Sequence, residues 1–308
     1  MTRASLKFKL PALMSVFFLS LCAAASDYQG SFERKFQVNG PAKLDIDAGA
    51  SDIVVSKGPG GVVTVTGKIH VNNRWIFGER ASRVQELKNN PPVRQDGNTI
   101  LVGHTNVNNI WIDYEIAVPM DTRVQSQTGS GDVKIQGLNS DLDLQSGSGD
   151  LILEEITGKI RTRSGSGDVR ARGISGPFSG EASSGDIQLE ERGAGDVDIH
   201  TTSGNIEAKG VDGALRMEAG SGDISVEGKP ARNWDVQTGS GNVHVNMPSS
   251  AGFQLQASTS SGELNVNHAI TVTVQSSMDA ARHEIKGTVG GGGPQVTVHT
   301  GSGDIDIE

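Results

Sequence analysis

The stretch Thr128-Gly-Ser-Gly-Asp-Val-Lys-Ile135 contains a phrase that the chain repeats: Ser-Gly, an anchor residue, then two apolar residues separated by one position. The anchors of the nine copies are Asp132, Asp150, Asp168, Asp186, Asn205, Asp223, Asn242, Glu263 and Asp304. Successive anchors lie 18, 18, 18, 19, 18, 19, 21 and 41 residues apart. A fixed period near 18 residues is typical of stacked coils rather than of a closed globule.

The residues around each anchor alternate with period two. Positions one and three after the anchor are apolar in every copy, as is position eight before it, and position four before it is always small. This alternation indicates two short strands per repeat, each with one buried face. Two strands of about five residues cannot form a core alone, so neighbouring repeats must stack. We therefore expect an all-β fold, a parallel β-solenoid of about nine to ten coils.

The Ser-Gly pair marks the corner between the two strands. Glycine can adopt the positive φ that a tight turn requires, and we expect it to do so here. The serine is small, and its hydroxyl can bond to backbone or to the serine one coil away. A nucleophilic serine would need one base beside one activated hydroxyl, whereas nine identical serines and scattered histidines favour a structural corner.

The anchors form a predicted ladder of turn-capping side chains, because Asp and Asn share an oxygen that accepts hydrogen bonds from turn amides. The predicted members are Asp132, Asp150, Asp168, Asp186, Asn205, Asp223, Asn242 and Asp304. Calcium binding is the alternative, but nonapeptide calcium repeats carry an acid every nine residues, and here asparagine is accepted. We expect no cofactor, no metal and no catalytic residue.

The N-terminal residues 1–25 have the pattern of a signal peptide. Arg3, Lys7 and Lys9 precede an apolar run ending at Cys22, and three alanines follow. A lipid anchor on Cys22 is the alternative. Cleavage would remove 3 of 27 basic residues and none of 36 acidic ones, so the net charge would change from −9 to −12. We expect an exported protein, periplasmic or at the cell surface, without nucleic-acid binding or a transmembrane span.

The sequence pattern of residues 26–125 differs from that of the repeats at 126–308. Leu44 to Val55 fits the repeat template as a first coil, and an insertion follows with strands at 62–69, 99–102 and 110–118 and a helix at 79–88. This insertion is expected to cap one end of the stack, because an open sheet edge invites pairing with other chains. The chain stops inside a strand after Asp304, so we expect an open C-terminal coil that could associate end to end.

Three segments carry a resemblance to a known family. They are Tyr114-Glu-Ile-Ala-Val-Pro119, the ladder of Ser-Gly-Asp phrases, and the closing run from Lys286 through the glycines at 290–293 to Asp304-Ile305. In these segments the chain resembles the bacterial "putative adhesin" family, a β-strand-repeat domain of unknown function 4097, over roughly Leu44 to the end. The resemblance implies an envelope-associated β-solenoid and carries no defined catalytic site.

The first functional hypothesis is a non-enzymatic envelope module that binds an envelope protein or polysaccharide, or acts as a scaffold. Aromatic side chains are common in such contacts, and the insertion holds the candidates Trp75, Phe77 and Trp111. A second hypothesis is a polysaccharide-acting enzyme whose acid–base groups would be His268, His283 and Glu284. A third is a spacer associated with envelope stress or signalling.

Overall fold

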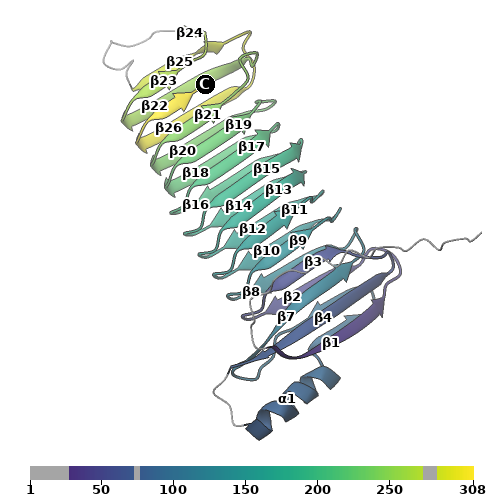
Figure 1. Cartoon of the computed structure of the whole chain (residues 1–308). Helices are drawn as coiled ribbons and strands as arrows, with labels where there is room; N and C mark the ends of the chain where they lie inside the picture. Colours follow the sequence, from purple (N-terminus) through teal and green to yellow (C-terminus); the bar gives the residue numbers. More distant parts are fainter. Residues whose placement is uncertain (1–27, 73–76, 273–282) are drawn as a thin grey trace, which may run out of the picture.

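Two long β-sheets face each other along a rod-shaped molecule (Figure 1). The computed structural model describes residues 28–72, 77–272 and 283–308. Within these residues one sheet has 13 strands, the other has 14, and helix α1 (Phe77–Asn89) lies at one end. The predicted parallel β-solenoid with a helix-containing cap is confirmed.

Each coil contributes one strand to each sheet. The 14-stranded sheet receives β2 (Lys43–Ala48), β8 (Arg123–Thr128), β10 (Leu142–Ser146), β12 (Ile160–Ser164), β14 (Phe178–Ala182), β16 (Val197–Thr201), β18 (Leu215–Ser221), β20 (Trp234–Ser240), β22 (Phe253–Ser261) and β26 (Gln295–Ser302). The 13-stranded sheet receives β3 (Ile53–Lys57), β9 (Val133–Gln136), β11 (Leu151–Glu154), β13 (Val169–Ser175), β15 (Ile187–Gly193), β17 (Ile206–Val211), β19 (Ile224–Gly228), β21 (Val243–Asn246), β23 (Leu264–Val266) and β27 (Ile305–Ile307). The strands of successive coils pair in parallel and in register, so that Leu142 lies beside Ile160 and Ile160 beside Phe178. Equivalent apolar side chains therefore stack in continuous buried rows.

The period-two pattern missed one of these rows, which lies at the second corner of the coils. Leu138, Ile156, Ile174 and Val211 are fully buried there, six residues after their anchors. A bulge between β13 and β15 brings Glu191 into this row beside Ile174. A carboxyl group, 7% exposed, thus occupies a position that apolar side chains fill in neighbouring coils.

The corner glycine is required mainly because the backbone of the neighbouring coil lies close to it. Its φ angle requires glycine at only some of the corners. A Cβ at Gly149 would lie 2.1 Å from the carbonyl oxygen of Gly131 one coil below, and Gly303 shows the same distance to Gly241. Gly303 has a φ of +143°, but Gly149 is not among the residues of positive φ. The expectation of a positive φ at every corner is therefore wrong, because stacking at sheet spacing leaves no room for a side chain whatever the local turn.

The hydroxyl groups that satisfy the corner lie two residues earlier than expected. The corner serines, such as Ser148, are exposed. Instead Ser146 donates to the oxygen of Gly149 at 2.7 Å, and Ser164 donates to Gly167 at 2.6 Å. The chain turns after the fourth position before the anchor, so this position is the last inward one of its strand and its hydroxyl reaches the corner backbone.

The cap continues both sheets past the first coil. Strands β1 (Tyr28–Gln37), β4 (Val62–Val71) and β7 (Ile110–Val118) extend one sheet, and β5 (Val93–Asp96) and β6 (Thr99–Val102) extend the other. The predicted first coil is present as β2 and β3, which pair with β8 and β9. Strands β1 and β5 were not predicted. The helix ends before Pro91-Pro92, in agreement with the expected stop.

Side chains cover the outer edge of β1, the last strand of its sheet. The Arg34 guanidinium donates to the oxygen of Glu33 at 2.9 Å and to the final carbonyls of α1, Lys88 at 3.0 Å and Asn89 at 2.9 Å. The Gln95 amide donates to the oxygen of Gln37 at 2.7 Å. These bonds occupy β1 carbonyls that could otherwise pair with another chain, and they fasten α1 to the sheet.

The last coil of the sequence does not lie at the end of the stack. Strand β26 lies between β20 and β22, and β27 lies between β21 and β23. The end is formed by the Phe253–Val266 coil and by the hairpin of β24 (Ile270–Val272) and β25 (Glu284–Val289), which pairs antiparallel with β22. The expectation of an open C-terminal coil is wrong, because the long excursion after Glu263 lets the chain return and insert its final coil between two earlier ones.

Candidate functional site

The anchors form a hydrogen-bond ladder along one corner of the stack. In each rung, a side-chain oxygen of one anchor accepts a hydrogen bond from the backbone N–H of the anchor in the next coil, with N···O distances of 2.7–3.1 Å. The acceptors are Asp52, Asp132, Asp150, Asp168, Asp186, Asn205, Asp223, Asn242 and Asp304. Asp and Asn are equivalent in this role because only an oxygen acceptor is used.

The ladder continues into the cap. Asp113 on β7 accepts from the N–H of Asp52 at 3.0 Å, and so provides the first rung. Its other oxygen lies 2.8 Å from Nε2 of His70, a side chain only 4% exposed. Burial raises the pKa of Asp113, while the Asp52 N–H and His70 oppose that rise. The bond from the Asp52 N–H to Asp113 therefore joins the cap to the first coil, and the contact with His70 lies within the cap.

Two devices separate the negative charges of the ladder. Arg170 bridges two successive anchors, Asp150 and Asp168, at 2.6 Å each. Burial disfavours the Asp150 carboxylate, but the hydrogen bonds from Arg170 and from the Asp168 N–H outweigh burial and lower the pKa of Asp150. Farther along, Asn205 and Asn242 alternate with aspartates. The ladder of stabilising bonds thus carries few adjacent unpaired carboxylates.

The predicted aromatic contacts do not converge into one site. Trp111 on β7 is half-buried and stacks on His70, with ring centroids 5.2 Å apart and an interplanar angle of 9°. Trp75 lies outside the described residues, and Phe77 is the first residue of α1. In the stack the aromatic residues are Phe178, Trp234 and Phe253, and each is at most 1% exposed. The flank of the stack therefore presents no aromatic platform.

The residues proposed for acid–base chemistry lie at the far end of the stack. Glu284 on β25 forms an ion pair with Lys286 at 2.6 Å. His268 packs edge-on against Phe253, with ring centroids 5.7 Å apart. Within the described part of the chain, no hydrogen bond links the side chains of His268, His283 and Glu284 into one acid–base group.

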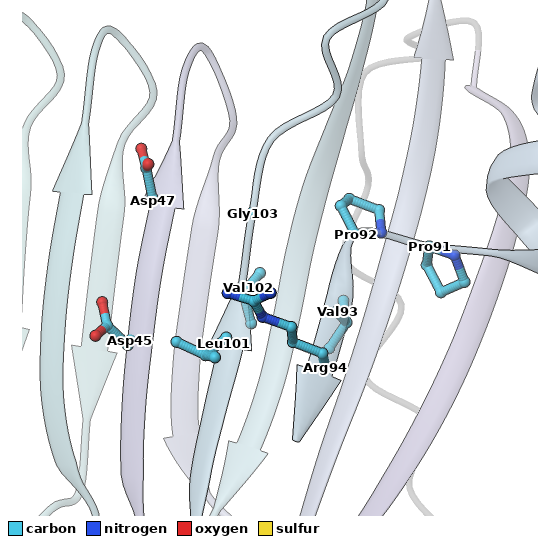
Figure 2. A pocket seen from close by; sticks show the side chains of 9 residues that line it. All are labelled: Asp45, Asp47, Pro91, Pro92, Val93, Arg94, Leu101, Val102 and Gly103. Carbon is cyan, nitrogen blue, oxygen red and sulfur yellow. The ribbon is translucent and has the colours of Figure 1, made fainter. Parts of the chain in front are cut away.

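A hollow of about 470 Å³ lies where the cap meets the first coil (Figure 2). We call it the junction groove, and its principal side chains come from three neighbouring strands: Asp45 and Asp47 from β2, Leu101 from β6, and Arg94 from β5, with Pro91 and Pro92 just before β5. The sheet register places Asp45 beside Leu101 and Leu101 beside Arg94. Carboxylates and a guanidinium thus border opposite sides of an apolar floor.

The local sequence explains why this hollow exists. Gly103 follows β6 and has no side chain to fill the space next to Pro92. The helix stop at Pro91-Pro92 turns the chain back toward the sheet, where the N–H of Gly103 donates to the oxygen of Pro92 at 2.8 Å. A groove lined by mixed charges over an apolar floor can bind a polar ligand without catalysing a reaction.

The junction groove was not predicted, although one signal for it is present in the sequence. The first coil alone carries acids at both outward positions, seven and five residues before its anchor, namely Asp45 and Asp47. The β5 side could not be predicted, since Val93–Asp96 is a four-residue strand without an apolar alternation.

One protein family matches most of the chain. Residues 42–308 match the family described as Toastrack DUF4097. The chain belongs to this family. The match confirms the resemblance noted in the sequence and includes the first coil, the cap insertion and the whole stack. A comparison with curated proteins finds no match.

Several solved structures are similar in outline at low sequence identity. A "putative lipid binding protein" from Parabacteroides distasonis has 13% identity and a TM-score of 0.41, covering 90% of this chain and 96% of its own. A "putative adhesin" from the same organism has 11% identity and a TM-score of 0.32, covering 92% and 98%. A "putative cell adhesion protein" from Clostridium sporogenes has 15% identity and a TM-score of 0.27, covering 90% and 99%. Among the described residues of the present chain, no helix is long and apolar enough to cross a membrane.

Proposed function

We propose that the chain is an exported, non-enzymatic binding module of the bacterial cell envelope, and that the junction groove is its ligand contact. The observation that carries this proposal is the groove itself, a hollow of about 470 Å³ lined by Asp45 and Asp47 on one side and by Arg94 on the other. Binding sites of this kind combine an apolar surface with a few well-placed polar groups. The sequence resemblance to a family named "putative adhesin" agrees with a binding role.

The stack would act as a rigid support for this groove. Ten coils at the usual strand spacing extend roughly 45 Å. All three aromatic side chains of the stack are buried, which favours a contact in the cap region over one along the flank. The groove would then lie at one end of the rod, and the stack would separate it from the other end.

The proposed export depends on the signal-peptide pattern of residues 1–25, which lie outside the described residues. Cleavage after Ala25 would remove Cys22, the only cysteine, so the mature chain would form no disulfide. The regular hydrogen-bond ladder offers stabilisation that does not depend on disulfides.

A substitution that fills the groove tests the proposal. A Cβ at Gly103 would lie 3.5 Å from the oxygen of Pro92, an ordinary contact, so Gly103→Leu should fold normally and occupy the hollow. Gly60→Leu is the matched control, because a Cβ there meets no atom within 4 Å. We expect the immobilised mature chain to retain envelope polymer, Gly60→Leu to retain the same amount, and Gly103→Leu to retain less than a tenth.

Equal retention by both variants, with unchanged circular dichroism and melting temperature, would show that the groove is not the contact. N-terminal sequencing of the protein recovered from the envelope fraction tests the export step. We expect the mature protein to begin at Ser26, and a chain that retains Met1 would contradict export with cleavage.

A further inference from the structure

We propose that the junction groove binds an acidic saccharide, with a sugar carboxylate at Arg94 and sugar hydroxyls at Asp45 and Asp47. This inference rests on the proposed function, because it assigns a ligand class to the same groove. It follows from the arrangement of the three strands, from the charges that already have partners, and from the hydrogen bonds that two neighbouring carboxylates can accept.

The groove has the width of a single extended polymer chain. Its two sides are β2 and β5, which are separated by β6 alone, so the sides lie roughly 10 Å apart at the usual strand spacing. The floor is formed by Leu101, which is half-buried, and by the open position at Gly103. Figure 2 shows Arg94 reaching from β5 toward Leu101 and Val102, over this floor. A chain lying along β6 would meet carboxylates at one edge and the guanidinium at the other.

Arg94 is the cation of the groove that has no partner among the described residues. Asp45 has an ion pair with Lys43 at 3.1 Å, and Nδ1 of His104 lies 3.8 Å from Asp47, where it carries a charge only when the imidazole is protonated. Arg94 is exposed and makes no ion pair with any residue that the structure describes. A guanidinium binds a planar carboxylate through two parallel hydrogen bonds, so the ligand group that Arg94 favours is an anion.

The acidic side of the groove favours hydroxyl groups over a peptide edge. Asp45 and Asp47 point to the same face, about 7 Å apart, and ionised carboxylates only accept hydrogen bonds. An extended peptide presents a carbonyl oxygen beside each N–H, and each such oxygen would face a carboxylate without a proton between them. Sugar hydroxyls can all donate, and the apolar C–H face of a sugar ring fits the floor at Leu101 and Gly103. The observations therefore favour a saccharide over a peptide.

The test is calorimetric titration of the mature chain with three acidic saccharides, namely tetragalacturonate, a hyaluronan tetramer and sialyllactose. Cellotetraose serves as the uncharged saccharide and an alternating Gly-Glu peptide as the acidic peptide. We expect at least one acidic saccharide to bind at least tenfold more tightly than both. Arg94→Gln should weaken that binding at least tenfold, and the affinity should fall as sodium chloride is raised.

Asp47→Asn should weaken binding severalfold, since the amide accepts through one oxygen only. Gly103→Leu should abolish binding, and Gly60→Leu should leave it unchanged. The proposal is overturned if no acidic saccharide exceeds cellotetraose, if the acidic peptide binds best, or if Arg94→Gln has no effect. Should these outcomes occur while Gly103→Leu still abolishes retention of envelope polymer, the groove remains the contact and only the ligand class is wrong. If Gly103→Leu affects neither measurement, both proposals fail.

Discussion

Single residues at the corners determine how closely the coils can stack. At each Ser-Gly corner the glycine lies against the backbone of the preceding coil, and the anchor beside it accepts a bond from the following one. Both interactions join neighbouring coils, so a corner substitution affects a coil interface as well as its own turn. This explains why glycine recurs at the corner of all nine Ser-Gly repeats, whereas the anchor tolerates Asp, Asn and one Glu.

Gly149→Ala should therefore destabilise the stack. The added Cβ would approach the oxygen of Gly131 to 2.1 Å and its carbonyl carbon to 2.5 Å, and these backbone atoms are held by the ladder. We expect a loss of about 2–4 kcal/mol in the free energy of unfolding, measured by urea denaturation. Gly60→Ala, in open space, should change it by less than about 0.5 kcal/mol. Similar values for both variants would contradict the close-approach argument.

Glu191 introduces a pH dependence into the buried row that it shares with Ile174 and Val211. Burial raises the pKa of Glu191 to about 8; the N–H of Asp212 opposes this rise and the Asp212 carboxylate adds to it. Between the ordinary pKa near 4.5 and about 8, the unfolded chain loses this proton while the folded chain keeps it. The contribution of the protonated carboxyl group to the free energy of unfolding is therefore fully present below pH 4.5, and it is lost as the pH rises through 8.

In the wild type, this group should lower the free energy of unfolding by roughly 3–5 kcal/mol as the pH rises across this range. Glu191→Ile should not show this decrease. The measurement is the melting temperature of both proteins from pH 4.5 to pH 9, and the wild-type value should fall more steeply with pH. Glu190→Gln, at the exposed neighbouring position, serves as the control and should follow the wild type. Parallel curves for the wild type and Glu191→Ile would show that this carboxyl group does not contribute.

At the scale of elements, the coils are nearly interchangeable in their pairing surfaces. Every coil presents the same apolar rows and the same anchor, so β20 could accept either β22 or β26 as its neighbour. The structure places β26 there and moves β22 outward. The hairpin of β24 and β25 then covers one edge of β22. The order of the coils therefore depends on the connections as well as on the repeats.

This order can be tested by placing the same charge in two coils. Ile305 on β27 is fully buried between β21 and β23, whereas Leu264 at the equivalent position of β23 is half-buried at the end of its sheet. Ile305→Asp should reduce the free energy of unfolding by about 3–5 kcal/mol, and Leu264→Asp by about 1 kcal/mol. If the coils were stacked in chain order, Ile305, three residues before the C-terminus, would lie at the end of the stack. Leu264→Asp would then have the larger effect on the free energy of unfolding. A larger effect of Leu264→Asp in thermal and urea unfolding would contradict the inserted position of the last coil.

At the scale of the whole molecule, the two ends of the rod are built in different ways. At the N-terminal end the cap strands extend the sheets (Figure 1). Arg34 and Gln95 donate to carbonyls of the outer strand β1. At the other end the chain reverses into a hairpin and returns to insert its final coil. The junction groove lies at the N-terminal end, where β2, β6 and β5 meet, so the proposed contact and the regular support occupy different parts of one rod.

The sequence by itself determined the coil, because its information is local. An 18-residue period, an apolar alternation and a glycine at each corner specify two strands, a turn and a stacking row without reference to distant residues. The same pattern predicted the first coil and the anchors as hydrogen-bond acceptors, and the stop at Pro91-Pro92 marked the end of the cap helix. Each of these depends on side-chain parity or on local turn chemistry.

Only the tertiary structure decided the coil order, the bonding partner of each anchor and the position of the groove. Coils with identical pairing rows do not encode their neighbours, so the connections and the cap select the order. Glycine proved necessary because the backbones of neighbouring coils approach closely at the corner. This distance lies between two repeats, so the sequence of one repeat does not specify it. The groove joins Asp45 to Arg94 across β6, and these residues, 49 positions apart, become neighbours only when the cap strands pair beside the first coil.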